Sequence, residues 1–82
     1  MTQMSEAAQK IIEIVAEKMD KPKDSITFDM SFVNDLGCDS LDTVELMMDI
    51  EDAFDLSIPE EDAEKIVTIG DAVKYVESHS SN

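Results

Sequence analysis

The chain has 82 residues, with twenty acids against six lysines and no arginine, so its formal net charge is −14. Nucleic acid is a disfavoured partner, because phosphate binding needs clustered basic residues, and an anionic membrane surface would repel the chain. Basic protein surfaces are the expected partners, since a field of one sign speeds their encounter. Solubility alone is the alternative explanation of the charge.

A chain of this length predicts one domain over 1–82, with disordered ends at about 1–4 and 79–82. The 43% apolar content allows a small core, and the two glycines, two prolines and scarcity of alternating β-branched runs favour helices. The single cysteine cannot form an internal disulfide. The sequence shows neither a signal peptide nor an apolar run of membrane-spanning length, so we expect a cytoplasmic protein.

The first helix is expected to begin after Ser5, a good N-cap residue. Its buried stripe has apolar residues at spacings of three and four: Ala8, Ile11, Ile12, Val15 and Met19. Pro22 ends this helix, because the residue before a proline disfavours helical geometry. The connection up to Cys38 is too apolar for a free linker, and several of its residues should pin it to the core: Ile26, Phe28, Met30, Phe32, Val33 and Leu36. Ser31 is expected to cap a single helical turn over 32–36.

A loop that ends at Gly37 leads into a second helix over about 40–54. Asp39 is a good N-cap for this helix, which places Ser40 at the first helical position with its hydroxyl pointing outward. A phosphate on that hydroxyl would lie beside backbone N–H groups, where helix N-termini bind anions well. In the alternative, Ser40 is itself the N-cap and has no chemistry.

The second helix has two different faces, if each residue turns it by about 100°. The face toward the core holds Thr43, Leu46, Met47, Ile50 and Phe54. The opposite face holds Leu41, Val44 and Met48, beside Asp42, Glu45, Asp49 and Asp52. Like charges at such spacings cost about 0.2–0.5 kcal/mol per pair, which a purely structural helix has no reason to bear. This pattern is typical of a docking surface; the alternative is a solvated face with scattered apolar residues.

A turn and a brief helix over 60–65 follow, anchored to the core by Ile58, Ala63 and Ile66. Thr68 is expected to cap the last helix, with Asp71 completing a weak capping box. The stripe of this helix is Ile69, Ala72, Val73 and Val76. Tyr75 should lie at the edge of the core with its hydroxyl in water, and the tail from Ser78 should fray.

Neither catalytic residues nor a metal site are expected. His79 lies in the tail, where it cannot be positioned for acid–base work. One cysteine and one histidine exclude the usual zinc site. The acidic run over 49–55 lacks the glycine and the ligand spacing of a calcium-binding loop.

The phosphopantetheine attachment segment of acyl carrier proteins is similar to residues 35–46 here, Asp-Leu-Gly-Cys-Asp-Ser-Leu-Asp-Thr-Val-Glu-Leu. The resemblance runs from about Ser5 to His79 and includes flanking segments on both sides: Ser31-Phe32-Val33, Phe54, Ile58-Pro59 and Ala63-Glu64-Lys65-Ile66. It implies an all-α fold, a small bundle of three longer helices plus one short helix.

By this resemblance, Ser40, next to Asp39, carries 4′-phosphopantetheine, which a carrier-protein synthase (a phosphopantetheinyl transferase) takes from coenzyme A. The chain would be a monomeric carrier and not an enzyme. It would hold the growing fatty acyl chain as a thioester for fatty-acid synthase enzymes and acyltransferases with basic docking patches. The positions that match partner contacts in the family are Asp39, Leu41, Asp42, Val44, Glu45, Met48, Glu51, Asp52 and Ile58. The positions that match the acyl pocket are Phe32, Leu46, Met47, Ile50, Ile58, Ala63, Ile66 and Ala72.

Two residues depart from the family pattern: Cys38 stands where a small residue such as alanine is usual, and Asp49 where many members are neutral. The Cys38 thiol either is a tolerated small group or forms intermolecular disulfides on oxidation. Two other functions stay open. One is an unmodified acidic helical adaptor that binds basic proteins, which covalent modification of Ser40 would exclude. The other is a polyketide- or peptide-synthetase-type carrier, although such carriers usually lie in longer and less acidic chains.

Overall fold

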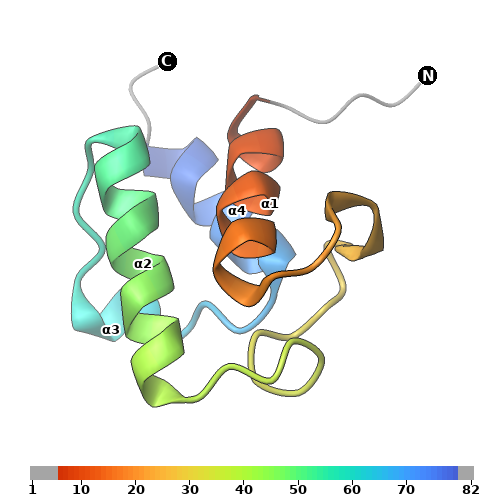
Figure 1. Cartoon of the computed structure of the whole chain (residues 1–82). Helices are drawn as coiled ribbons and strands as arrows, with labels where there is room; N and C mark the ends of the chain where they lie inside the picture. Colours follow the sequence, from red (N-terminus) through yellow and green to blue (C-terminus); the bar gives the residue numbers. More distant parts are fainter. Residues whose placement is uncertain (1–5, 80–82) are drawn as a thin grey trace.

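The computed structural model describes residues 6–79, and its regular structure in that range is helical apart from one isolated backbone bridge (Figure 1). The helices are α1 (Glu6–Met19), the short 3₁₀ turn η1 (Lys23–Ser25), α2 (Ser40–Phe54), α3 (Glu60–Ala63) and α4 (Ile69–His79). The predicted bundle of three longer helices and one short helix is therefore confirmed. The predicted cap at Ser5 and the predicted disorder of 1–4 and 80–82 lie outside the described residues.

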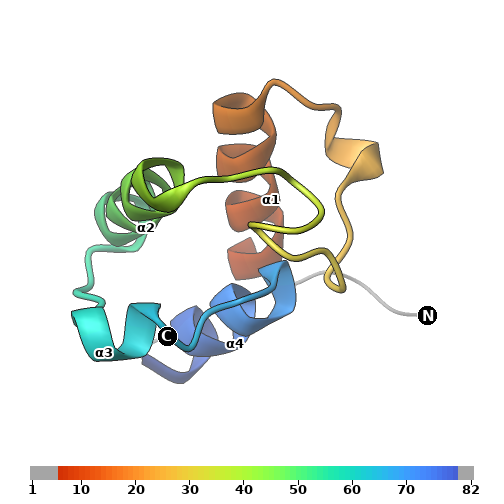
Figure 2. The same ribbon diagram turned by 90° about the horizontal axis from the view of Figure 1, so that it is seen from below.

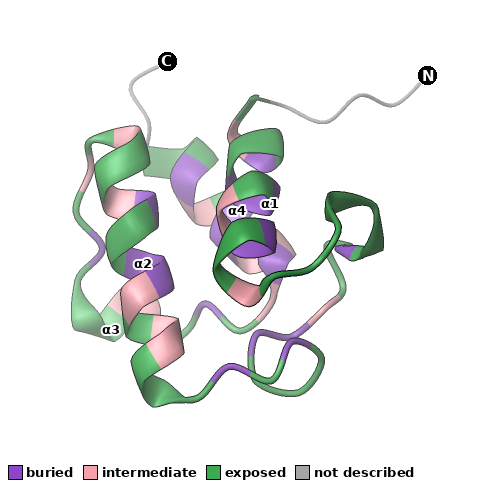
Figure 3. Ribbon diagram, viewed as in Figure 1, coloured by how far each residue is buried: buried purple, intermediate pink, exposed green. Residues whose placement is uncertain are grey.

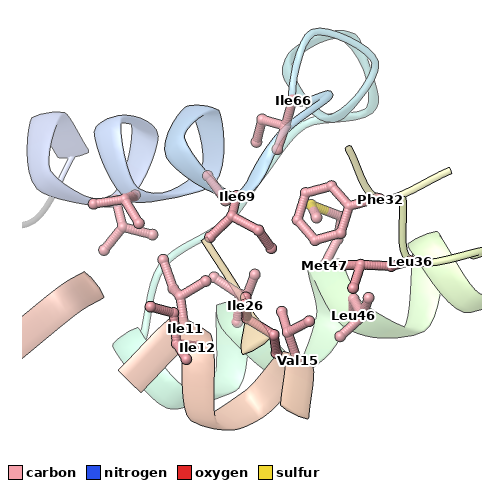
Figure 4. Close-up of a cluster of buried hydrophobic side chains, with 14 of the residues drawn as sticks. Ile11, Ile12, Val15, Ile26, Phe32, Leu36, Leu46, Met47, Ile66 and Ile69 are labelled. Carbon is pink, nitrogen blue, oxygen red and sulfur yellow. The ribbon is translucent and has the colours of Figure 1, made fainter. Parts of the chain in front are cut away.

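The core lies where α1 packs against both α2 and α4. The predicted stripes of α1 and α4 are buried, except that Met19 is half-buried. Figure 3 shows these buried positions turned inward on each long helix. Figure 4 shows side chains of α1, α2, α4 and the connecting segments pointing into one shared apolar cluster. The described residues thus share one hydrophobic core.

The connection between α1 and α2 passes beside the start of α4 (Figure 2). It is held to the rest of the chain by side chains and by backbone pairing. Ile26, Phe32 and Leu36 are buried in the core, as expected. Phe28 and Val33 were expected to help pin this segment, but they are 43% and 60% exposed. Backbone hydrogen bonds hold the segment instead, because it forms a short antiparallel bridge with the residues that lead into α4.

The bridge pairs Ser31 with Thr68. Beside it, the Phe32 N–H donates to the Val67 carbonyl and the Ile69 N–H to the Met30 carbonyl, both at 3.0 Å. The predicted cap at Ser31 is present, since its hydroxyl accepts from the Asn34 N–H at 3.1 Å. The Asp35 N–H donates to the Ser31 carbonyl at 3.0 Å, which closes the single helical turn predicted after this cap, and the turn is not continued into a longer helix.

The C-terminal third follows the prediction with two corrections. The Thr68 hydroxyl accepts from the Asp71 N–H at 3.1 Å, and the Asp71 carboxylate accepts from the Thr68 N–H at 3.2 Å, which confirms the capping box. The short helix ends at Ala63, two residues before the predicted boundary. The α4 helix continues through His79, whose ring stacks on Tyr75 at 4.0 Å between centroids, so Ser78 and His79 are ordered in the helix.

Tyr75 lies at the edge of the core, as predicted. Its hydroxyl donates to the Asp62 carboxylate at 2.9 Å, a contact that the sequence did not indicate. Among residues 6–79, no helix has the length and apolar character needed to cross a membrane.

Candidate functional site

The backbone conformation of the loop before α2 leads the chain directly into the first turn of the helix. Gly37 has a φ of +75°, a left-handed conformation that a side chain disfavours, while no heavy atom crowds the position of a Cβ there. The Cys38 N–H then donates to the Phe32 carbonyl at 2.8 Å. Because Phe32 is itself 1% exposed, this bond ties the loop end to the core.

Asp39 is the N-cap of α2 and its side chain accepts from the Asp42 N–H at 2.9 Å. The Asp42 carboxylate in turn accepts from the Asp39 N–H at 3.5 Å, which completes a capping box. The Asp39 carbonyl accepts from both the N–H and the hydroxyl of Thr43 at 3.0 Å. The predicted N-cap is confirmed, and the alternative in which Ser40 is the cap is wrong.

Ser40 is therefore the first residue of α2, and it is exposed. Its hydroxyl has no capping task, because Asp39 performs it. Helix geometry leaves the N–H groups of the first turn without carbonyl partners in the chain before it, and the helix dipole adds partial positive charge there. An anion attached to the Ser40 oxygen would lie beside these groups.

The Cys38 thiol lies behind this site and points inward. Cys38 is 3% exposed, and its Sγ lies 3.6 Å from the Met19 Sδ. Burial raises the pKa of the thiol, and the carboxylates of Asp42 and Asp39 raise it further. A buried, protonated thiol is a poor nucleophile, so the structure favours the tolerated small residue over a disulfide-forming one.

The outer surface of α2, here called the docking face, consists of Leu41, Val44 and Met48 with the acids Asp42, Glu45, Asp49 and Asp52. The three apolar side chains are 63%, 54% and 56% exposed, as the helical spacing predicted. Figure 3 shows this side of α2 as mostly exposed ribbon. An apolar strip on one helix is thus bordered by carboxylates along its length.

Besides Asp39 and Asp42 of the capping box, two more acids among the predicted partner contacts are engaged inside the chain, which spacing along α2 did not indicate. The Glu45 carboxylate forms an ion pair with the Lys18 ammonium from the last turn of α1. The Glu51 carboxylate accepts from the Ile58 N–H at 2.6 Å and so holds the turn after α2. Ile58 was assigned both to partner contacts and to the acyl pocket; it is 8% exposed, which leaves little of it for a partner.

The residues predicted to line the acyl pocket lie together in the core, contributed by the α1–α2 connection, α2, the segments around α3 and α4 (Figure 4). Seven are buried and Ala63 is half-buried; the buried ones are Phe32, Leu46, Met47, Ile50, Ile58, Ile66 and Ala72. Over the described part of the chain, no group of three histidine, cysteine or acidic residues could hold a metal ion.

Comparison with known proteins gives a consistent result. A sequence profile of the family described as "Phosphopantetheine attachment site" matches residues 9–76, which include the Asp39–Ser40 helix start. The acyl carrier protein of Porphyromonas gingivalis is 49% identical over 76 residues, or 93% of this chain and 97% of the relative. That of Lactobacillus johnsonii is 47% identical over 93% of this chain and 95% of the relative.

A solved structure of the thermally stable acyl carrier protein from Enterococcus faecalis has a TM-score of 0.80 and 39% identity, and the match covers 92% of this chain and 95% of that one. These relatives are named acyl carrier proteins, which are carriers and not catalysts, and the matching family profile is that of a phosphopantetheine attachment site. The chain belongs to the acyl carrier proteins.

Proposed function

We propose that Ser40 is the residue that carries 4′-phosphopantetheine, joined through a phosphodiester to its hydroxyl oxygen. The observation that carries this proposal is the capping box of Asp39 and Asp42, which frees an exposed hydroxyl at the first position of α2. The residues present fit the group, because the N-terminus of a long helix favours the phosphate charge. When bound, the arm would supply a terminal thiol that holds an acyl chain as a thioester.

The acyl chain on this carrier is proposed to be a growing fatty acid. The carrier is proposed to be a single domain over 1–82 and to work in the cytoplasm. The similarity to free-standing bacterial acyl carrier proteins over 93% of this chain supports this assignment. The buried pocket residues supply an apolar interior into which an acyl chain can fold back if the bundle loosens.

The partners are proposed to be a carrier-protein synthase, fatty-acid synthesis enzymes and acyltransferases that present basic patches to the docking face. Leu41, Val44 and Met48 offer exposed apolar contacts close to Ser40 on the same helix. The surrounding carboxylates and the net charge of −14 favour rapid encounter with a basic surface. Asp39, Asp42, Glu45, Glu51 and Asp52 are the proposed acidic contacts; Ile58 stays a pocket residue.

Intact-protein mass spectrometry tests the attachment. The wild-type chain, Ser40→Ala and Ser57→Ala are each incubated with coenzyme A and a carrier-protein synthase. Ser57 is a matched control, because it is another exposed serine, in the turn after α2. A phosphopantetheine-sized mass gain in the wild type and in Ser57→Ala, but not in Ser40→Ala, is expected. No gain in a folded wild-type chain would favour the unmodified acidic adaptor.

A further inference from the structure

The ion pair between Lys18 and Glu45 joins α1 to the middle of the docking face. In the described part of the chain one other ion pair is present, between Lys23 and Glu13, and it involves no residue of α2. Within residues 6–79, Lys18 is thus the basic side chain that forms an ion pair with the docking face.

Lys18 is placed among several acids of that face. Ile14, Glu17, Lys18 and Asp49 line one shallow hollow where α1 meets α2. The hydrogen bond to Glu45 raises the pKa of the Lys18 ammonium, and the charges of Glu45, Asp49 and Asp42 act in the same direction against a smaller desolvation effect. The Lys18 ammonium thus contacts Glu45 and lies in the field of Asp49 and Asp42.

The pair is also open to exchange. The side chains of Lys18 and Glu45 are 29% and 43% exposed, so a second cation can approach Glu45 from solvent. A surface ion pair of this kind contributes little to folding. Breaking it would therefore leave the bundle intact and would change mainly the charge that a partner meets.

We propose that Lys18 is an internal competitor for the docking face, which a lysine or arginine of the partner enzyme must displace from Glu45. This inference rests on the proposed function. Lys18 lowers the attraction around Glu45, whereas Asp52, near the far end of the face, is not among the acids whose charges act on Lys18. Partners whose cations meet Asp52 are favoured over partners that depend on Glu45.

The test is a double-mutant cycle on binding to the carrier-protein synthase, measured by surface plasmon resonance in a Ser40→Ala background so that no modification intervenes. The variants are Lys18→Gln, Glu45→Gln and their combination. Lys10→Gln is the matched control, because Lys10 is an exposed lysine on the same helix and its loss changes the net charge equally. Each variant is measured at low and at high salt.

At low salt, Lys18→Gln is expected to raise the association rate about two- to fivefold above that of Lys10→Gln. Glu45→Gln should slow association more in the Lys18→Gln background than in its absence, and high salt should reduce both effects. Equal rates for Lys18→Gln and Lys10→Gln, or additive effects in the cycle, would overturn the inference.

Mass spectrometry with the same synthase separates this outcome from a failure of the proposed function. A mass gain on wild-type Ser40 together with additive rates would remove the role of Lys18 and leave the carrier assignment in place. Absence of both the mass gain and synthase binding would overturn the two proposals together.

Discussion

The Tyr75 hydroxyl on α4 donates a hydrogen bond of 2.9 Å to the Asp62 carboxylate on α3. This bond matters because α3 has four residues, none of them buried, and so short a helix is not stable by itself. Buried Ile58 and Ile66 hold the chain on either side of α3. The Tyr75–Asp62 bond adds a direct link from the short helix to a long one, above a surface hollow of about 260 Å³ that both residues line.

Tyr75→Phe is expected to loosen α3 while the bundle stays folded. The change removes the hydroxyl but keeps the ring that stacks on His79. A typical intramolecular hydrogen bond contributes about 0.5–1.5 kcal/mol, and one to a charged acceptor can contribute more. Hydrogen exchange of the backbone amides over 62–64 should accelerate, with little change in α1. Asp62→Asn is the companion variant that keeps an acceptor. Equal protection of α3 in wild type and Tyr75→Phe would contradict this prediction.

Asp39→Ala is expected to lower the free energy of unfolding by about 1 kcal/mol, because it removes the N-cap of α2. Asp39→Ser keeps a capping oxygen and should recover most of the loss. Urea denaturation monitored by circular dichroism measures both variants. If the alanine and serine variants unfold at the same urea concentration, Asp39 does not stabilise the helix through its cap.

Gly37→Ala should also destabilise the loop, for a conformational reason. The backbone φ of +75° is strained for alanine, although space for its methyl group is open. Asparagine tolerates the left-handed region better than alanine. We therefore expect Gly37→Asn to be more stable than Gly37→Ala in the same urea titration. The reverse order would show that backbone strain at position 37 does not determine how far each substitution destabilises the protein.

Features that depend on near neighbours in the sequence were predictable. The cap at Asp39 and the capping box of Thr68 and Asp71 each involve residues three apart, and the buried stripes follow the helical period. The exposure of Leu41, Val44 and Met48 followed from the same period. This is why the sequence places Ser40 correctly at the helix start.

The missed contacts join residues far apart in the sequence. Lys18 and Glu45 are 27 residues apart, and Tyr75 and Asp62 are 13 apart, on helices whose relative orientation the local pattern does not give. The backbone bridge of Ser31 with Thr68 was missed for the same reason. Phe28 illustrates the converse error: its side chain was expected inside but is exposed, while its backbone carbonyl accepts one of the hydrogen bonds that hold the loop, from the Gly70 N–H.

The stabilising effect of Asp71 should depend on pH. Hydrogen bonds from the Val67 and Thr68 N–H groups lower the pKa of the Asp71 carboxyl below its usual range. A lowered folded-state pKa stabilises the fold above the unfolded value of about 3.9, and this stabilisation is lost as pH falls through the folded value. The difference in Tm between wild type and Asp71→Asn should therefore shrink below about pH 4.

Asp29→Asn controls for the change in net charge, since Asp29 is an exposed acid in the α1–α2 connection. Thermal unfolding is followed by circular dichroism between pH 7 and pH 3. If the difference in Tm between wild type and Asp71→Asn is independent of pH, the capping hydrogen bonds do not depend on the charge of the carboxylate.

The net charge of −14 should limit stability near neutral pH, because twenty acids crowd a small domain. Adding sodium chloride is expected to raise Tm, since it screens repulsion among exposed carboxylates. Neutralising two acids of the docking face by Asp49→Asn and Asp52→Asn should raise Tm in low salt and make the response to salt smaller. If Tm does not rise with salt, repulsion among the carboxylates does not limit the stability of the fold. The acids of the docking face would then not destabilise the folded state.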